Sequence, residues 1–182
     1  MSDTPVRLAH TSQLGESELD GIRDLLREAF DGDFGADDFE HALGGVHALA
    51  YGPGGELVAH GSVVQRRVLH AGRALRCGYV EAVAVRPGAR RRGLGGAVMA
   101  ELEEVIARAY VLGALSASDE GAALYAGRRW TVWAGRIGAL SPDGPVRLAE
   151  EEGSTYVWTP LGGALPDPAE GLWFDWRDGD VL

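Results

Sequence analysis

The segment YVEAVAVRPGARRRGLGG, from Tyr79 to Gly96, decides the fold of this chain. Its first part, Val80 to Val85, is a run of small and β-branched apolar residues with one carboxylate, which is typical of a strand covered on both faces. Arg86-Pro87-Gly88 ends that strand, because proline has no backbone N–H to donate and glycine permits turn dihedrals. The remainder is predicted to open a helix, since apolar residues then recur four positions apart at Leu94, Val98, Leu102 and Ile106.

The glycine-rich run at the start of that helix has the composition of an anion-binding site. The first turn of a helix has backbone N–H groups without helical partners and the positive end of the helix dipole, so it suits a phosphate group. Neither a Walker loop nor a dinucleotide fingerprint fits the spacing. The alternative is a solvated basic turn. The residues expected to hold the phosphate are Arg90, Arg91, Arg92, Gly93, Leu94, Gly95 and Gly96.

Composition limits the class of protein. The chain has 182 residues, of which 46% are hydrophobic, and we expect one globular domain over residues 1–182. The net charge of −10, from 27 acidic and 17 basic residues, argues against a general nucleic-acid binder and permits a cationic ligand. We expect no membrane segment and no signal peptide. The single cysteine, Cys77, indicates a reducing cytoplasm.

Apolar periodicity and turn residues predict a mixed sheet with helices on both faces. The long helix is expected to end near Leu112 with Gly113 at its C-cap, and Ser118 or Asp119 is expected to cap the next helix. In chain order the predicted elements are strand Val6–His10, a helix with Leu19, Ile22, Leu26 and Phe30 on one face, helix Asp38–Leu43, strands Val46–Tyr51, Leu57–Leu69 and Leu75–Val85, the glycine-loop helix, strand Ala114–Ser116, a helix containing Leu124 and Tyr125, and strands Thr131–Leu140 and Thr155–Thr159.

Several blocks of the sequence resemble one group of enzymes. The pattern Arg-x-x-Gly-x-Gly at Arg90–Gly95 resembles the pyrophosphate loop of the GCN5-related N-acetyltransferases, the GNAT superfamily. More specific blocks, spread over nearly the whole chain, resemble the aminoglycoside 2′-N-acetyltransferases of actinobacteria. These blocks are GDF (32–34), EHALGGVHAL (40–49), ALRCGYVEAVAVR (74–86), LGALSAS (112–118), LYAGRRW (124–130) and DWRDGDV (175–181).

The resemblance implies a fold, a co-substrate and a reaction. The implied fold is the α/β (α+β) GNAT fold, in which a mixed, mostly antiparallel central sheet is flanked by helices and splayed central strands form the acetyl-CoA cleft. Backbone groups of Val83, Ala84 and Val85 are expected to line that cleft. The implied reaction is direct attack of the 2′-amine of an aminoglycoside on the thioester in a ternary complex, without a metal. A homodimer is implied as well.

Acetyl transfer to an amine needs a neutral amine, a stabilised oxyanion and a proton for the leaving thiolate. Glu81 is the candidate base, acting through water, because a carboxylate in an apolar strand is costly without solvent or a partner. Strand alternation would place it on the same face as Val83. The alternative is a structural carboxylate paired with an arginine such as Arg76. The resemblance assigns Tyr125 to protonate coenzyme A, whereas the sequence alone favours a core tyrosine.

A polycationic aminoglycoside is best recognised by carboxylates and by hydroxyl or carbonyl acceptors. The residues that the resemblance assigns to the antibiotic are Asp33, Glu81, Ala82, Ser116, Glu151 and Asp180, with Asp38 as a further candidate. Taken alone, each loop acid would be interpreted as a solvated side chain. The sequence departs from the family at Glu150–Gly153, where an aspartate-rich stretch is expected, and at Leu182, where an aromatic residue is expected.

Two other functions stay open at this point. One is a GNAT enzyme for another cationic amine, such as a cell-wall precursor or a polyamine. The other is a non-catalytic acyl-CoA-binding sensor, against which the presence of both Glu81 and Tyr125 argues. Cys77 is not expected to be a nucleophile, because direct attack needs no acyl-enzyme and a lone strand cysteine is usually a small buried group. The histidines show no metal-ligand spacing.

Overall fold

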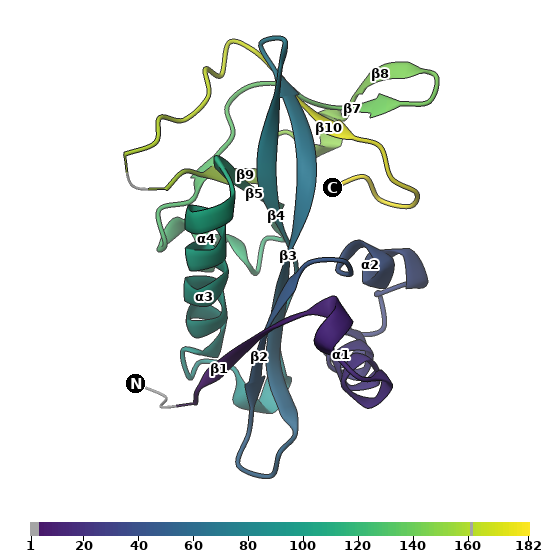
Figure 1. Ribbon diagram of the computed structural model, residues 1–182, viewed down its shortest axis with the longest axis vertical. Helices are drawn as coiled ribbons and strands as arrows, with labels where there is room; N and C mark the ends of the chain where they lie inside the picture. The colour runs from purple at the N-terminus through teal and green to yellow at the C-terminus, as the bar shows by residue number, and fades with distance from the viewer. Residues whose placement is uncertain (1–3, 161) are drawn as a thin grey trace. The chain divides into compact units, whose positions relative to one another are not determined.

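The computed structural model describes residues 4–160 and 162–182. Its helices are α1 (Glu16–Ala29), α2 (Ala36–His41), α3 (Leu94–Ala109) and α4 (Ala122–Ala126), with 3₁₀ turns at Thr11–Gln13, Pro87–Ala89 and Ala149–Glu151. Its strands are β1 (Val6–His10), β2 (Val46–Tyr51), β3 (Leu57–His70), β4 (Arg73–Val85), β5 (Leu112–Ser116), β6 (Thr131–Val132), β7 (Ile137–Ser141), β8 (Gly144–Arg147), β9 (Thr155–Trp158) and β10 (Leu172–Asp175). The hydrogen-bonded strand order is β6-β9-β5-β4-β3-β10-β7-β8, with β2 also paired to β3 and β1 to β2 (Figure 1). The predicted mixed sheet with flanking helices is confirmed.

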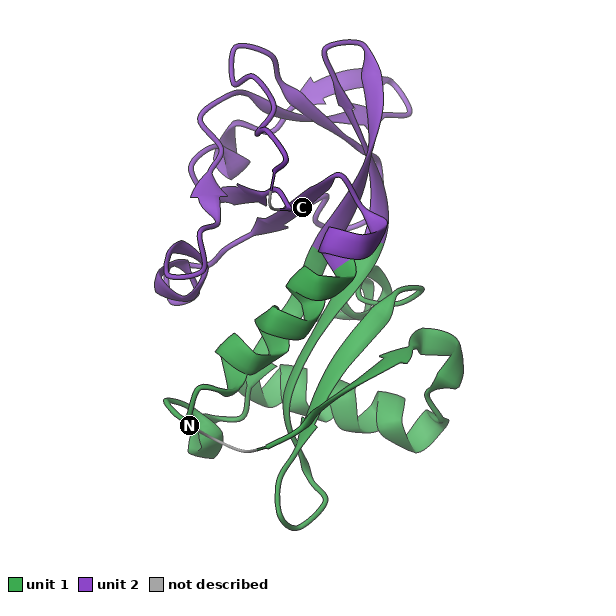
Figure 2. Cartoon of the chain, turned by 60° about the vertical axis from the view of Figure 1, so that its left-hand side comes forward, with its two compact units in different colours: residues 1–64, 80–105 green, residues 65–79, 106–182 purple. Residues whose placement is uncertain are grey.

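The chain forms two compact units (Figure 2). Unit 1 consists of residues 1–64 and 80–105, and unit 2 consists of residues 65–79 and 106–182. Both units contain parts of β3, β4 and α3, because the boundaries fall inside these elements. The prediction of one domain over residues 1–182 stays a prediction. Among the described residues, no helix has the length and apolarity needed to cross a bilayer.

In unit 1, α1 and α2 cover one face of the strands and α3 covers the other (Figure 1). β1, β2 and β3 are antiparallel neighbours, and the register places Leu49 opposite His60 and Ala48 opposite Gly61. Because side chains alternate between the faces of a strand, Leu49 and His60 share the α1 face. Gly61 faces α3, where a Cβ atom would come within 2.8 Å of Val98. A side chain at this position would therefore push the helix away from the sheet.

The apolar face of α1 forms the core of unit 1. Ile22, Leu25 and Leu26 are fully buried in a cluster that includes Ala84 of β4. Burying each such side chain stabilises the fold by about 1.5–3 kcal/mol. Phe30 was predicted on this face but is 37% exposed, because the helix ends at Ala29 and Phe30 stacks on a neighbouring loop ring instead. Leu25, which was not predicted on the apolar face, is buried in the core.

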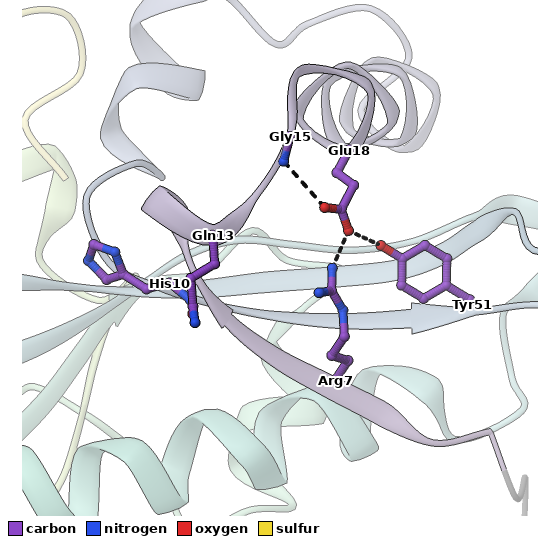
Figure 3. Close-up of polar contacts among 6 residues, drawn as sticks. All are labelled: Arg7, His10, Gln13, Gly15, Glu18 and Tyr51. Carbon is purple, nitrogen blue, oxygen red and sulfur yellow. Dashed lines mark hydrogen bonds and ion pairs between the residues drawn. The ribbon is translucent and has the colours of Figure 1, made fainter.

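A carboxylate ties α1 to the first two strands (Figure 3). One oxygen of Glu18 accepts hydrogen bonds from the Tyr51 hydroxyl, at 3.1 Å, and from the Arg7 guanidinium. Its other oxygen accepts from the backbone N–H of Gly15, which lies at the helix N-cap. The same acid therefore caps α1, offsets the helix dipole and joins it to β1 and β2.

Unit 2 combines parallel and antiparallel pairs. The first part of β4 pairs in parallel with β5, in the register Cys77 to Leu112, and β5 pairs antiparallel with β9. β10 lies between β3, to which it is antiparallel, and β7, to which it is parallel. Phe174 of β10 is fully buried and meets the Tyr79 ring edge-on at 5.7 Å.

Two predicted helix boundaries are wrong. The long helix ends at Ala109, and both Leu112 and Gly113 belong to β5. Gly113 is required for packing rather than for a C-cap, because a Cβ atom there would lie 3.0 Å from the Trp130 ring. The N-cap of α4 is Gly121, which has no side chain to cap the helix. Ser118 lies before the cap, and its backbone carbonyl accepts a hydrogen bond from the Gly121 N–H at 3.0 Å.

The C-terminal half of the chain contains more strands than predicted. The expected strand Thr131–Leu140 is two strands, β6 and β7, separated at Trp133–Arg136. Trp133 is buried there and donates its indole N–H to the Arg136 carbonyl at 3.2 Å, so the chain bends around the ring. β7 and β8 form an antiparallel hairpin in which Ser141 pairs with Gly144, so Pro142 and Asp143 make its tight connection. β10 had no sequence signal beyond a short apolar triplet in a glycine- and proline-rich tail.

Candidate active site

The strand that carries Glu81 is not regularly pleated. Ala82 has a φ of 52°, in the left-handed region, although it lies within β4. Such a residue interrupts the alternation of side chains, as in a β-bulge. The prediction that Glu81 and Val83 share a face therefore does not follow from alternation. Val83 faces α3, since a Cβ atom on Gly61 would lie 3.2 Å from its side chain.

The residues around Ala82 combine burial with partial solvent access. Glu81, Ala82, Val83 and Val85 are half-buried, whereas Ala84 is buried in the α1 core. A half-buried carboxylate can keep water in contact with its oxygens, which a base acting through water requires. The guanidinium of Arg76, the alternative partner considered for Glu81, donates its Nε–H to the Ala109 carbonyl at 2.6 Å in unit 2.

The glycine loop begins a helix where the sequence predicted it. A short 3₁₀ turn at Pro87–Ala89 follows β4, and α3 begins at Leu94, which is buried. Arg91 and Gly93 both have left-handed backbone conformations, with φ of 61° and 80°. The Gly93 carbonyl accepts the first helical hydrogen bond, from the Ala97 N–H at 3.0 Å. Gly95 and Gly96 therefore lie in the first turn, where N–H groups have no helical acceptor.

The three arginines of this loop have different positions. Arg90 donates its Nε–H to the Val85 carbonyl at 3.2 Å and an Nη–H to the Ala29 carbonyl at 3.1 Å. Its side chain therefore joins the loop to the end of α1. All three side chains are exposed. The Arg90 guanidinium is held by two backbone carbonyls, whereas Arg91 and Arg92 lie in the loop just before α3.

Replacing Gly93 by alanine is expected to weaken acetyl-CoA binding about 5- to 30-fold, because the left-handed conformation costs an L-residue about 1–2 kcal/mol. The dissociation constant, measured by isothermal titration calorimetry, checks this. Gly88→Ala is the matched control, since Gly88 has no positive φ and open space around its Cα. It should bind acetyl-CoA as the natural protein does. Equal weakening by both substitutions would exclude the helix start from cofactor binding.

Tyr125 is held in an aromatic cluster of unit 2. It lies in α4, is 7% exposed, and packs against Tyr156 and Trp130 with ring-centroid distances of 5.9 and 6.3 Å. Burial disfavours the charged phenolate and raises the pKa of Tyr125 to about 12. The hydroxyl is therefore protonated over the whole physiological pH range, as a proton donor must be. The core and donor interpretations of this tyrosine are compatible.

The structure brings two predicted substrate residues of unit 2 together. The Ser116 hydroxyl, at the end of β5, donates to Oε2 of Glu151 at 2.8 Å, and the Ser154 hydroxyl donates to the same oxygen at 3.3 Å. The backbone carbonyl of Glu151 accepts from the Thr155 hydroxyl at 2.9 Å. Both ends of Glu151 are thus fixed against β5 and β9. An oriented, half-buried carboxylate is well suited to accept hydrogen bonds from an ammonium group.

Asp180 lies in a tail that a buried arginine holds in place. The Arg66 side chain is 2% exposed; its Nε–H donates to Oδ1 of Asp175 at 3.0 Å, and one Nη–H donates to the Val181 carbonyl at 2.6 Å. Arg177 donates to the same Val181 carbonyl at 2.9 Å. Asp180 itself is exposed. The tail is therefore anchored at Asp175 and at Val181, and Asp180 lies between these two anchors with its carboxylate exposed to solvent.

The remaining predicted acids lie in the loop and short helix that follow α1. Asp33 is exposed in the loop between α1 and α2. Asp38 is half-buried, and its Oδ2 accepts from the Gly35 N–H at 2.7 Å, so it caps α2. This local bond gives Asp38 a structural role that sequence reasoning had not assigned. Within residues 4–160 and 162–182, no group of three His, Cys, Asp or Glu side chains is arranged to hold a metal.

Comparison with known proteins identifies the family of this chain. A family model described as an acetyltransferase (GNAT) domain matches residues 10–132. An aminoglycoside 2′-N-acetyltransferase of Mycolicibacterium fortuitum is 49% identical over 178 residues, covering 96% of this chain and 90% of that protein. The model match covers more than half of the chain, and the relative is similar over almost all of it.

Solved structures share the fold at low sequence identity. The GNAT family N-acetyltransferase YhbS from Escherichia coli, in complex with CoA, is 16% identical with a TM-score of 0.65, covering 96% of this chain and 90% of that one. A probable N-acyltransferase from Enterococcus faecalis V583 is 19% identical, with a TM-score of 0.58. The match covers 73% of this chain but only 34% of the Enterococcus protein. These structures show the fold, while the family model and the Mycolicibacterium relative show that the chain belongs to the GNAT superfamily and, within it, to the aminoglycoside 2′-N-acetyltransferase family.

Proposed function

We propose that this protein transfers the acetyl group of acetyl-CoA to the 2′-amino group of aminoglycoside antibiotics, by direct attack in a ternary complex. The observation that carries the proposal is the 49% identity to the M. fortuitum aminoglycoside 2′-N-acetyltransferase over 96% of this chain. The glycine loop supports the cofactor part, because a helix that starts after two left-handed residues offers several N–H groups to a pyrophosphate. In this proposal the loop residues 90–96 and the backbone of residues 83–85 bind acetyl-CoA.

The proposed reaction needs one base and one acid. The amine nitrogen forms a bond to the acetyl carbon as the carbon–sulfur bond breaks. Glu81 takes the proton of the amine through a water molecule, and Tyr125 gives a proton to the departing thiolate of coenzyme A. One proton leaves the amine and one reaches the sulfur, so the step is balanced. A tyrosine with a pKa of about 12 is present in the donor form that this role requires.

The proposed antibiotic contacts are acids and carbonyl or hydroxyl acceptors. They are Asp33, Glu81, Ala82, Ser116, Glu151 and Asp180. The hydrogen bonds from Ser116 and Ser154 to Glu151 support its inclusion, because they orient the carboxylate before any ligand arrives. Pre-orientation lowers the entropy cost of binding a flexible polycation.

A second candidate is acetylation of a different cationic amine. It is favoured by the departure at Leu182, a half-buried aliphatic residue where the family resemblance led us to expect an aromatic ring. Mass spectrometry of products formed from acetyl-CoA with an aminoglycoside, a polyamine and a cell-wall amino sugar distinguishes the two. We expect the aminoglycoside to be acetylated with the highest kcat/KM. A faster reaction with another amine would replace the proposed substrate, and acetyl-CoA binding without any product would indicate a sensor.

We further propose that the protein works in the cytoplasm as a homodimer and protects its host against aminoglycosides. The reduced, buried thiol of Cys77 is compatible with a reducing compartment. Acetylation would remove a positive charge from the drug, which weakens its electrostatic attraction to an anionic target. Light scattering of the purified protein tests the homodimer, and drug susceptibility of expressing cells tests the protection of the host.

A further inference from the structure

A chain of hydrogen-bonded side chains leads to Ala82, the residue with the left-handed conformation beside Glu81. On the α1 face of unit 1, the Thr11 hydroxyl lies 2.7 Å from Nε2 of His47, and Nδ1 of His47 lies 2.9 Å from Nε2 of His60. Nδ1 of His60 lies 2.9 Å from the carbonyl oxygen of Ala82. The side chains come from three segments of the chain that are distant in sequence. Both histidines are fully buried.

The carbonyl at the end sets the direction of every bond in the chain. A carbonyl oxygen only accepts, so Nδ1 of His60 carries a proton and donates it. Neutral His60 then has an acceptor at Nε2, which requires His47 to donate from Nδ1. His47 in turn accepts at Nε2 from the Thr11 hydroxyl, and that hydroxyl accepts from the Gly44 N–H at 2.9 Å. The Gly45 carbonyl lies 3.3 Å from the same hydroxyl but already accepts from the Thr11 N–H at 3.0 Å, so it does not need the hydroxyl proton. With both rings neutral, one arrangement of protons satisfies all of these groups.

Both rings are neutral in this arrangement. Burial lowers the pKa of His47 to about 4, with a smaller electrostatic contribution from His10, and lowers the pKa of His60 to about 3, with a contribution from His47. With both rings neutral, each contact between Thr11, His47 and His60 joins one donor to one acceptor. The bonds therefore hold the same orientation across the pH range in which the proposed reaction would be assayed.

The conformation that His60 contacts is one that alanine seldom adopts. A left-handed φ costs an L-residue about 1–2 kcal/mol, and Ala82 has a φ of 52° within a strand. A hydrogen bond to the Ala82 carbonyl offsets part of this cost, because burying that carbonyl without a donor would be unfavourable. His60 thus stabilises a local conformation that the residue type itself disfavours.

The same bond orients the next peptide group. In a trans peptide the C=O of one residue and the N–H of the next point in opposite directions. With the Ala82 carbonyl directed at His60 of β3, the Val83 N–H is directed away from that ring. Val83 is one of the residues that we propose to bind acetyl-CoA through backbone groups. The orientation of its N–H is therefore coupled to a side chain that itself touches no substrate.

We propose that His60, held in one tautomer by His47 and Thr11, is a positioning residue that fixes the Ala82–Val83 peptide so that the Val83 N–H can donate to the thioester carbonyl. The catalytic part of this inference rests on the proposed acetyl transfer. The geometric part is that one set of imidazole tautomers fixes one orientation of the Ala82–Val83 peptide. This part does not depend on acetyl transfer. The experiment therefore needs one readout for each part.

The geometric readout is nuclear magnetic resonance of the imidazole nitrogens and of the Val83 amide in the full chain. We expect both His47 and His60 to be neutral and protonated at Nδ1 between pH 6 and 8. We also expect the Val83 amide resonance to move in His60→Leu, which has no donor, and to stay close to its natural position in His60→Asn. Protonation of His60 at Nε2, or an unmoved Val83 amide in His60→Leu, would overturn the inference.

The catalytic readout is kcat per folded molecule, with acetyl-CoA and an aminoglycoside. His60→Leu is expected to lower kcat about 10- to 100-fold, because a displaced donor near the reacting carbonyl loses transition-state stabilisation. His60→Asn keeps an N–H near the Nδ1 position and should restore kcat to within about threefold of the natural value. A merely structural histidine would lower the melting temperature in both variants and leave kcat per folded molecule unchanged in both.

Ser62→Ala is the matched control. Ser62 lies two residues along β3 from His60, on the same face, and its buried hydroxyl has no hydrogen-bond partner among the described residues. The substitution should leave both kcat and the Val83 resonance unchanged. If the natural protein acetylates no amine, the proposed function fails while the resonance data still decide the geometry. If acetylation proceeds and kcat is the same in His60→Leu, only the positioning inference fails.

Discussion

Glu81→Gln is expected to lower kcat/KM for the aminoglycoside about 100-fold below neutral pH, and progressively less as the pH rises. A general base typically contributes about 10²–10⁴-fold to a rate. The loss depends on pH because the antibiotic amine is mostly an ammonium at low pH and needs a base to become nucleophilic. At high pH the neutral amine is already abundant. Steady-state kinetics with coenzyme A detection, from pH 6 to pH 9, measures the profile.

Tyr125→Phe is the comparison that separates a base from an acid. Burial raises the pKa of Tyr125 to about 12, so its proton is present throughout that pH range. The rate lost on removing the hydroxyl should therefore be the same at every pH tested. A pH-independent loss in Glu81→Gln would assign Glu81 to positioning, and an unchanged rate in that variant would remove it from the mechanism.

Arg66→Met is expected to destabilise unit 2 by about 3 kcal/mol, since the substitution removes the donors of buried carbonyl groups while it keeps the apolar stem. Arg66 is 2% exposed and holds Asp175 and the Val181 carbonyl, so the tail that contains Asp180 should become mobile. For a chain of this size the melting temperature should fall by roughly 6–12 °C. The KM for the antibiotic should rise, whereas the dissociation constant of acetyl-CoA should not change.

Arg147→Ala is the control for a lost arginine. Arg147 also pairs with a carboxylate, Glu152, through Nε at 2.9 Å and Nη at 2.8 Å, but its side chain is 55% exposed. Exposed pairs contribute little because water and salt screen them. Its melting temperature should change far less than that of Arg66→Met. Equal effects would mean that burial of Arg66 contributes nothing beyond its ion pair.

The sequence predicted the elements that are marked by their own residues and by the turn residues next to them. The bounds of β1 and β2 match the predicted strands Val6–His10 and Val46–Tyr51. Both are short apolar runs bounded by residues that break strands: Pro5 precedes β1, and Gly45 and Gly52 flank β2. The start of α3 after the glycine loop was predicted for the same reason. Elements that depend on distant partners were missed. β10 is stabilised by pairing with β3 and β7, which its four residues cannot indicate alone.

The candidate site shows the same division. Ser116 and Glu151 were named from family resemblance, and their direct contact across 35 positions has no local signal. Arg66 was not named, because an arginine in a long strand is normally exposed and its partners lie more than 100 residues away. The left-handed conformation of Ala82 was also missed, since alanine in an apolar strand gives no reason to expect it. Glycine would have been the detectable signal.

The central claim is that this chain acetylates the 2′-amine of aminoglycosides. The most direct test measures coenzyme A release from acetyl-CoA with kanamycin B, which has an amine at the 2′ position, and with kanamycin A, which has a hydroxyl there. We expect release with kanamycin B and none with kanamycin A. Equal release with both drugs would place the acetyl group on another amine and contradict the proposed regiochemistry.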